Sequence, residues 1–163
     1  MNEPHDTAGV IAPPPLVALA AVFVGLFLDW LLPAYVLVVV LSIEFRVVIG
    51  VLLMAGGAAL AVYGRGMFVR SGTNVNPYKP ASALVTTGVY AHIRNPMYVG
   101  LAFLVAGIGI ALASDWTLVM LAAGALTIHY GVVQREETYL EAKFGEPYRQ
   151  YVATVPRYGW PPH

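Results

Sequence analysis

The chain has 163 residues, of which 58% are hydrophobic and 11% are charged, and its mean hydropathy is +0.68. Soluble domains carry roughly 25% charged residues, so this composition excludes an ordinary soluble protein and predicts an integral membrane protein surrounded by the lipid bilayer. The net charge of zero and the lack of a basic run give no indication of nucleic-acid binding, and the absence of cysteine excludes disulfides and thiolate nucleophiles.

Four apolar runs predict the membrane-spanning helices. Residues 1–15, with three consecutive prolines at 13–15, are expected to form a short flexible tail. The runs 16–32, 47–63, 97–113 and 116–133 follow, and a helix of about 17 residues just crosses a hydrocarbon core of about 30 Å. We therefore predict an all-α membrane bundle of about four transmembrane helices, built as one domain over 1–163.

The first run could be a signal peptide, but no basic segment precedes it and Asp29-Trp30 stands where a cleavage site would need small residues. We expect this helix to be retained. The apolar stretch 34–41 is too short to cross, and Glu44 and Arg46 interrupt its continuation, so we interpret it as a connector at the membrane interface.

Polar residues meet the membrane at the start of the third run, within residues 84–100. Arg94 and Asn95 precede Pro96, which is predicted to begin a helix because proline is favoured at a first helical position. The free amides of that helix end could bind an anionic group beside Arg94. The preceding loop of about 30 residues, between 64 and 96, is too long for a passive connection and is a candidate lid.

Only Ser114 and Asp115 separate the third and fourth runs, which predicts a tight helical hairpin with one of these residues as the helix cap. The hairpin should return residues 134–140 to the level of 94–98. Beyond it, Gly145 is expected to end a helix and Pro147 to begin a short one. Tyr148 and Tyr151 would share a face of that short helix, either as an interfacial aromatic belt or as a pocket wall.

Charge placement predicts the orientation. Eight of the nine Lys and Arg residues fall between the second and third runs or after the fourth, so both of these segments are expected on the cytoplasmic side, with both termini cytoplasmic. The histidines His5, His92, His129 and His163 lack helical ligand spacing, which argues against a metal site. His129 lies inside the fourth run, where an ionisable side chain is either bonded to a neighbouring helix or functional.

The predicted hairpin gathers a polar pocket of both charge signs. One side would supply Tyr90, Arg94, Asn95 and Tyr98, and the other Glu136 and Glu137. Such a pocket suits a zwitterionic ligand with a carboxylate, hydroxyl groups and a cationic centre.

Three segments carry a family resemblance: GTNVNPYKP at 72–80, LVTTGVYAHIRNPMYVG at 84–100, and REETYLEAKFGEPYRQYVATVPR at 135–157. In this order and around a hairpin they resemble the isoprenylcysteine carboxyl methyltransferase family, in particular its short prokaryotic members within a wider group that includes phospholipid methyltransferases.

The resemblance implies S-adenosylmethionine as the methyl donor, bound by a core over 64–163 that includes the cytoplasmic loop and the C-terminal helices, with two N-terminal membrane helices in 16–63. The implied cofactor contacts are Ser82, Ala83, Leu84, Val85, Tyr90, Arg94, Asn95, Pro96, Met97, Tyr98 and Glu136.

Two positions depart from the eukaryotic pattern. Asn95 replaces a histidine, and an amide can hold a ligand but cannot take up a proton at neutral pH. Val132 replaces an arginine that serves the prenylated substrate.

We therefore expect a membrane methyltransferase, in a prokaryotic inner membrane, that modifies a lipid-like or prenylated acceptor at a carboxyl, amine or thiol group. Arg94, Glu137 and His129 are the candidate catalytic residues, and the acceptor should enter laterally from the bilayer. The alternative is a non-enzymatic helical bundle, a scaffold or transporter subunit.

Overall fold

A computed structural model of the chain describes residues 7–159. Within this range every regular element is a helix: α1 (Pro14–Leu31), α2 (Val36–Val40), α3 (Ile43–Arg70), the 3₁₀ turn η1 (Gly88–Ala91), α4 (Pro96–Leu112), α5 (Asp115–Ile128), the π-helical turn η2 (His129–Val133), α6 (Gln134–Phe144) and α7 (Glu146–Thr154).

Three helical rods are long and apolar enough to cross a membrane: α1, α3, and the continuous rod from Asp115 to Phe144 formed by α5, η2 and α6. The fourth apolar helix, α4, has 17 residues and is shorter. The predicted all-α membrane bundle is thus confirmed, and the chain is an integral membrane protein.

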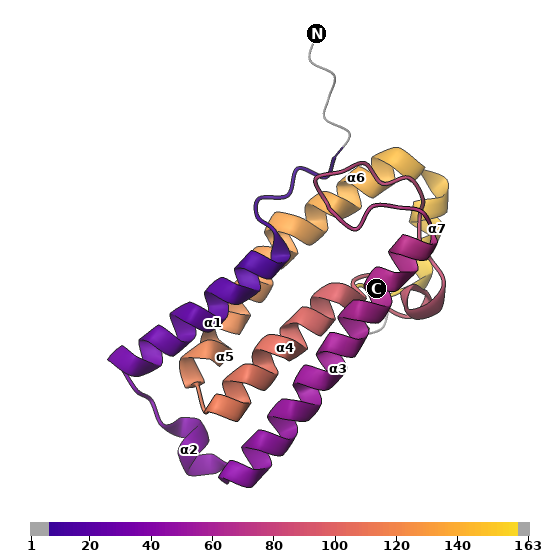
Figure 1. The fold of residues 1–163 in the computed structure, drawn as a ribbon. Helices are drawn as coiled ribbons and strands as arrows, with labels where there is room; N and C mark the ends of the chain where they lie inside the picture. Colours follow the sequence, from indigo (N-terminus) through magenta and orange to yellow (C-terminus); the bar gives the residue numbers. More distant parts are fainter. Residues whose placement is uncertain (1–6, 160–163) are drawn as a thin grey trace.

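The helices lie in two packed pairs, α3 along α4 and α1 along α5 (Figure 1). The loop after α3 gathers with α6 and α7 at one end of the bundle, whereas α2 lies at the opposite end (Figure 1). Polar structure is therefore concentrated at the end where α4 begins.

A seam of glycines brings α3 and α4 into backbone contact. Gly50, Gly57 and Gly64 are the buried residues of α3, and they recur every seven positions, which keeps them on one face. A Cβ added at Gly100 would lie 2.6 Å from the carbonyl oxygen of Gly57, and one added at Gly107 would lie 2.6 Å from that of Gly50. Small residues allow this close approach, which stabilises membrane helix pairs through packing.

The hairpin tip ties the opposite end together. The hydroxyl of Ser114 accepts a hydrogen bond from the Thr117 amide, which confirms Ser114 as the cap of α5. Asp115 instead accepts from the amides of Val36 and Leu37, at 2.8 and 3.0 Å. The predicted connector 34–41 contains a short helix, α2. Two free amide groups at its N-terminus donate to the Asp115 carboxylate at the hairpin tip.

The second membrane helix begins earlier than predicted. Ser42 caps α3, and Glu44 lies in its first turn. The stretch 34–41 does not continue into this helix, as predicted, but the break lies at Leu41 and Ser42 and not at Glu44 and Arg46. Glu44 and Arg46 belong to α3, where an acidic residue near the N-terminus is stabilised by the helix dipole. At about 1.5 Å per residue, a 28-residue helix spans about 42 Å, which carries its last turns beyond a typical hydrocarbon core.

The part of the N-terminal segment that precedes α1 lies against the helices. Val10 is buried, the Ile11 amide donates to the Gly131 carbonyl, and Arg135 donates to the Gly9 carbonyl. Pro14 and Pro15 already belong to α1, and residues 1–6, with His5, lie outside the described residues, as does His163.

Candidate functional site

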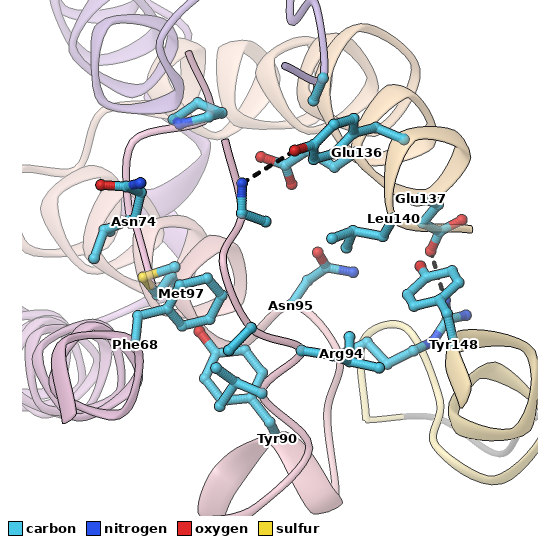
Figure 2. Close-up of a pocket in the computed structure, with 18 of the residues that line it drawn as sticks. Phe68, Asn74, Tyr90, Arg94, Asn95, Met97, Glu136, Glu137, Leu140 and Tyr148 are labelled. Atoms are coloured by element: carbon cyan, nitrogen blue, oxygen red, sulfur yellow. Dashed lines mark hydrogen bonds and ion pairs between the residues drawn. The ribbon is translucent and has the colours of Figure 1, made fainter. Parts of the chain in front are cut away.

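A polar pocket of about 110 Å³ opens where α3, α4, α6 and α7 meet the loop after α3. We call it the polar pocket. Its side chains converge from these separate elements, as Figure 2 shows. The loop and α3 line it with Phe68, Asn74, Val75, Asn76, Pro77, Lys79, Ala81, Ala83, Leu84 and Val85; the start of α4 and its approach with Tyr90, Arg94, Asn95, Met97 and Tyr98; and the C-terminal helices with Glu136, Glu137, Tyr139, Leu140, Tyr148 and Tyr151.

The hairpin joins Tyr98 to Glu136. Pro96 begins α4, as predicted, and places Tyr98 in its first turn. The Tyr98 hydroxyl donates a 2.8 Å hydrogen bond to Oε1 of Glu136, which lies in the first turn of α6. The predicted return of residues 134–140 to the level of 94–98 is confirmed, and a carboxylate stands in the pocket wall.

Glu137 is held by two arginines. Its Oε1 accepts from Arg94 Nη1 at 2.7 Å and from Arg157 Nε at 2.8 Å, and its Oε2 accepts from Arg157 Nη2 at 2.6 Å. The hydrogen bonds to Glu137 raise the pKa of Arg157. The Arg94 and Glu137 side chains are only 10% and 19% exposed, and the two residues meet beside Tyr148 (Figure 2).

The segment 155–157 runs beside the start of α4. The amides of Arg94 and Asn95 donate to the carbonyls of Pro156 and Arg157, at 2.9 and 3.2 Å. Arg94 Nε donates to the carbonyl of Val155 as well. Because the Arg94 side chain is committed to Val155 and Glu137, its first role in this structure is to fix the C-terminal segment to the pocket.

Tyr148 and Tyr151 are pocket walls, not members of an exposed aromatic belt, since only 4% and 8% of their surfaces are exposed. Tyr151 donates a 2.7 Å hydrogen bond to the carbonyl of Tyr90. Burial raises the pKa of Tyr148 to about 12 and also raises that of Tyr151, so both hydroxyls remain hydrogen-bond donors at neutral pH.

The Tyr90 hydroxyl is buried without a hydrogen-bond partner among residues 7–159. Its ring packs against Phe68 with centroids 5.1 Å apart, and burial raises the pKa of Tyr90, so the hydroxyl keeps its proton. A buried polar atom without a partner costs free energy, and one at a pocket wall marks a place where a bound molecule could satisfy it.

The loop is ordered by its own polar groups. Thr73 is buried, and its hydroxyl oxygen accepts from the amides of Ser82 and Ala83. The Ala81 amide donates to the Tyr139 hydroxyl of α6 at 3.0 Å. These bonds bring the start and end of the loop together and hold it over the pocket.

Most of the predicted contact residues line the polar pocket, but Ser82 and Pro96 are not among its lining residues. Ser82 is exposed and donates to the Gly72 carbonyl, whereas Pro96 is buried in the first turn of α4. Sequence reasoning missed Phe68, the loop residues 74–77 and Lys79, although the GTNVNPYKP motif contains these loop residues.

His129 lies apart from this pocket. It lines a second, apolar cavity of about 650 Å³ between α1, α4 and α5, which we call the apolar groove. Tyr98 lines both cavities, so the groove ends where the polar pocket begins. Val132 has no exposed surface and lines neither cavity.

The fold and these two cavities define a helical membrane protein with a polar pocket adjoining an apolar groove. Residues 45–147 match the phospholipid methyltransferase family, and the chain belongs to that family. It is 33% identical over 73 residues to protein-S-isoprenylcysteine O-methyltransferase of Schizosaccharomyces pombe. This similarity covers 45% of the chain and 31% of the relative, so the chain matches less than a third of that protein. No solved structure matches the chain.

Proposed function

We propose that this protein is an integral membrane methyltransferase that uses S-adenosylmethionine and methylates a lipid-like acceptor. The proposal rests above all on the Tyr98–Glu136 pair, which puts a carboxyl group in the wall of a pocket that is also lined by Tyr90, whose buried hydroxyl has no partner among residues 7–159. Family membership and the similarity to an O-methyltransferase support the reaction class.

The polar and aromatic groups of the pocket match those of S-adenosylmethionine, and since the pocket of about 110 Å³ is smaller than the roughly 300–1,000 Å³ of small-molecule sites, the loop after α3 would move outward when the cofactor binds. The cofactor carries an adenine ring, ribose hydroxyls, an amino-acid group and a positively charged sulfonium. Glu136 offers acceptors for the hydroxyls or the amino group, Phe68 and Tyr148 offer aromatic faces, and the amides of Asn74 and Asn95 offer both donors and acceptors. The Tyr90 hydroxyl would gain the partner that it lacks.

We assign cofactor binding to Ala83, Leu84, Val85, Tyr90, Asn95, Met97, Tyr98 and Glu136, with Arg94 holding the C-terminal segment in place. When bound, S-adenosylmethionine would supply an electrophilic methyl group activated by its positive sulfur. The protein then needs to orient the two reactants and to exclude water, which can supply most of the acceleration of a displacement reaction.

The acceptor would lie in the apolar groove. Its walls are almost wholly hydrophobic, formed by residues such as Ala18, Ala21, Leu101 and Leu121, and they lie between helices that face the bilayer. A hydrocarbon chain could enter laterally, and its head group would then lie near Tyr98. This placement supports a lipid-like or prenylated acceptor.

We further propose that the polar pocket faces the cytoplasm, that both termini lie on that side, and that the membrane is a prokaryotic inner membrane. The positive residues of the loop and of the segment after the hairpin, Arg70, Lys79, Arg135 and Lys143 among them, support this orientation through the positive-inside rule.

A scaffold or transporter subunit is the competing function. The glycine seam and the apolar surface fit a scaffold equally well. A scaffold does not account for a carboxylate and an unsatisfied buried hydroxyl in one pocket, and we therefore favour the enzyme.

The proposal is tested by titrating the purified protein in nanodiscs with S-adenosylhomocysteine. The wild-type protein should bind, and Glu136→Gln should weaken binding at least about tenfold, because a charged hydrogen-bond partner contributes about 1.5–3 kcal/mol. Glu141→Gln is the matched control, since Glu141 lies on the same helix but is exposed and outside the pocket lining. Absence of binding, or equal effects of the two substitutions, would contradict the proposal.

A further inference from the structure

The apolar groove has a polar end. Among its lining residues, Tyr98, His129 and Tyr158 carry the polar side chains, and the other side chains are hydrocarbon or glycine. His129 Nδ1 lies 2.8 Å from the Tyr158 hydroxyl, and their rings are 5.9 Å apart. A hydrocarbon chain in the groove would therefore bring its head group to His129 and Tyr158.

Local backbone structure places His129 there. It is the first residue of η2, the π-helical turn between α5 and α6. Such turns insert an additional residue into a helix and rotate the segments on either side relative to each other, and they are frequent at functional sites. This rod presents His129 to the groove and Glu136 to the polar pocket, with Tyr98 between them.

The other candidate proton acceptors, Glu136 and Glu137, do not line the groove. Glu137 accepts hydrogen bonds from Arg94 and Arg157, and Glu136 accepts one from Tyr98. His129 is the titratable group, apart from the two tyrosines, that lines the groove within the described chain. Burial raises the pKa of Tyr158 to about 12, so this tyrosine keeps its proton and orients the histidine.

The groove does not suit an anionic head group. No Lys or Arg is among the described residues that line it, and Arg94 and Arg157 are bound to Glu137. A carboxylate at the end of the groove would find no Lys or Arg to pair with among the described residues that line it. A head group that carries a proton fits better.

We propose that His129, oriented by Tyr158, accepts the proton released by a methyl acceptor whose head group is an amine or a thiol on a hydrocarbon chain. This inference rests on the proposed methyltransferase function. When Nδ1 carries the ring proton and donates it to the Tyr158 oxygen, Nε2 carries the lone pair and accepts a 3.3 Å hydrogen bond from Gln134 Nε2, which the acceptor head group would displace.

The lone pair of the acceptor nitrogen or sulfur forms a bond to the methyl carbon, and the bond between that carbon and the donor sulfur breaks. Its electron pair stays on sulfur, which leaves a neutral thioether. The proton of the acceptor passes to Nε2 of His129 and then to solvent.

The test uses the protein in phosphatidylcholine nanodiscs with ¹⁵N-labelled histidine rings. Hexadecylamine, hexadecanethiol, hexadecanoic acid and hexadecane are added in separate samples, and the His129 signals are identified by their loss in His129→Gln. We expect the amine or the thiol to shift the His129 ring signals, and hexadecane to leave them unchanged. Tyr158→Phe should displace the Nδ1 signal before any probe is added.

Turnover provides a second readout for any probe that accepts a labelled methyl group. His129→Gln should lower kcat at least about tenfold and leave KM unchanged, as expected for loss of a general base. No ring shift with the amine or the thiol, the same shift with hexadecane, or a larger shift with the acid would overturn the proposal.

Binding of S-adenosylhomocysteine separates this inference from the proposed function. His129→Gln should bind it as tightly as the wild type does, because His129 does not line the polar pocket. If the wild-type protein failed to bind S-adenosylhomocysteine, the proposed function would fail whatever the histidine signals showed.

Discussion

Tyr90 is the residue that distinguishes best between a ligand pocket and simple helix packing, because of the environment of its hydroxyl. It is buried and lacks a partner among the described residues, whereas the neighbouring Tyr151 hydroxyl donates to a backbone carbonyl. The two tyrosines therefore form a natural pair for mutation.

We predict that Tyr90→Phe leaves the thermal midpoint of the free protein unchanged or raises it, because no hydrogen bond is lost. The same substitution should weaken S-adenosylhomocysteine binding about threefold to tenfold, the equivalent of one hydrogen bond of about 1 kcal/mol. Thermal unfolding and calorimetry measure the two quantities.

Tyr151→Phe is the control with the opposite pattern. It leaves the Tyr90 carbonyl without its donor and should lower the thermal midpoint by a few degrees. If Tyr90→Phe destabilised the free protein as much as Tyr151→Phe, the hydroxyl would have a structural partner and the argument from its burial would fail.

At this scale the sequence predicted which residues come together but not how they pair. The tight hairpin was sufficient to bring Glu136 and Glu137 to Arg94 and Tyr98. Consecutive helical residues point about 100° apart, so their partners depend on the rotation of α6, which the π turn sets. The contact of Arg94 with Val155 had no sequence signal, because it joins two irregular segments.

Two adjacent glycines of α3 show how the helix pair is specified at the scale of elements. A Cβ at Gly57 would meet the carbonyl oxygen of Gly100 at 2.5 Å, whereas nothing lies within 4 Å of a Cβ at Gly56. The contact at Gly57 is to backbone, which cannot move aside as a flexible side chain can.

We predict that Gly57→Ala forces α3 and α4 apart and lowers the thermal midpoint of the protein in detergent by several degrees. Gly56→Ala should leave the midpoint unchanged or raise it, because alanine is the better helix former. Equal effects of the two substitutions would contradict the glycine seam as the contact that fixes these helices.

The elements were predicted well where hydropathy and caps define them, as for Pro96, Ser114 and Gly145. They were predicted less well where tertiary contacts decide. Helix α2 depends on Asp115 from a distant part of the chain, and the π turn at His129 depends on how the hairpin packs.

At the scale of the whole molecule, the orientation of the bundle in the membrane can be measured with single introduced cysteines, because the chain has no native cysteine. Ser71 follows α3 at the start of the loop that lies at the polar-pocket end, Tyr35 directly precedes α2 at the opposite end (Figure 1), and both residues are exposed. We predict that a membrane-impermeant maleimide labels Tyr35→Cys in cells with an intact inner membrane but labels Ser71→Cys only after that membrane is permeabilised. The reverse pattern would contradict the proposed orientation.

The central claim is that the polar end of the bundle binds the methyl donor, and hydrogen–deuterium exchange in nanodiscs tests it most directly. S-adenosylhomocysteine should slow exchange in residues 71–95 and 145–157, which surround the polar pocket, and leave residues 32–42 at the opposite end unchanged. Unchanged exchange in 71–95, or equal protection at both ends, would contradict the account.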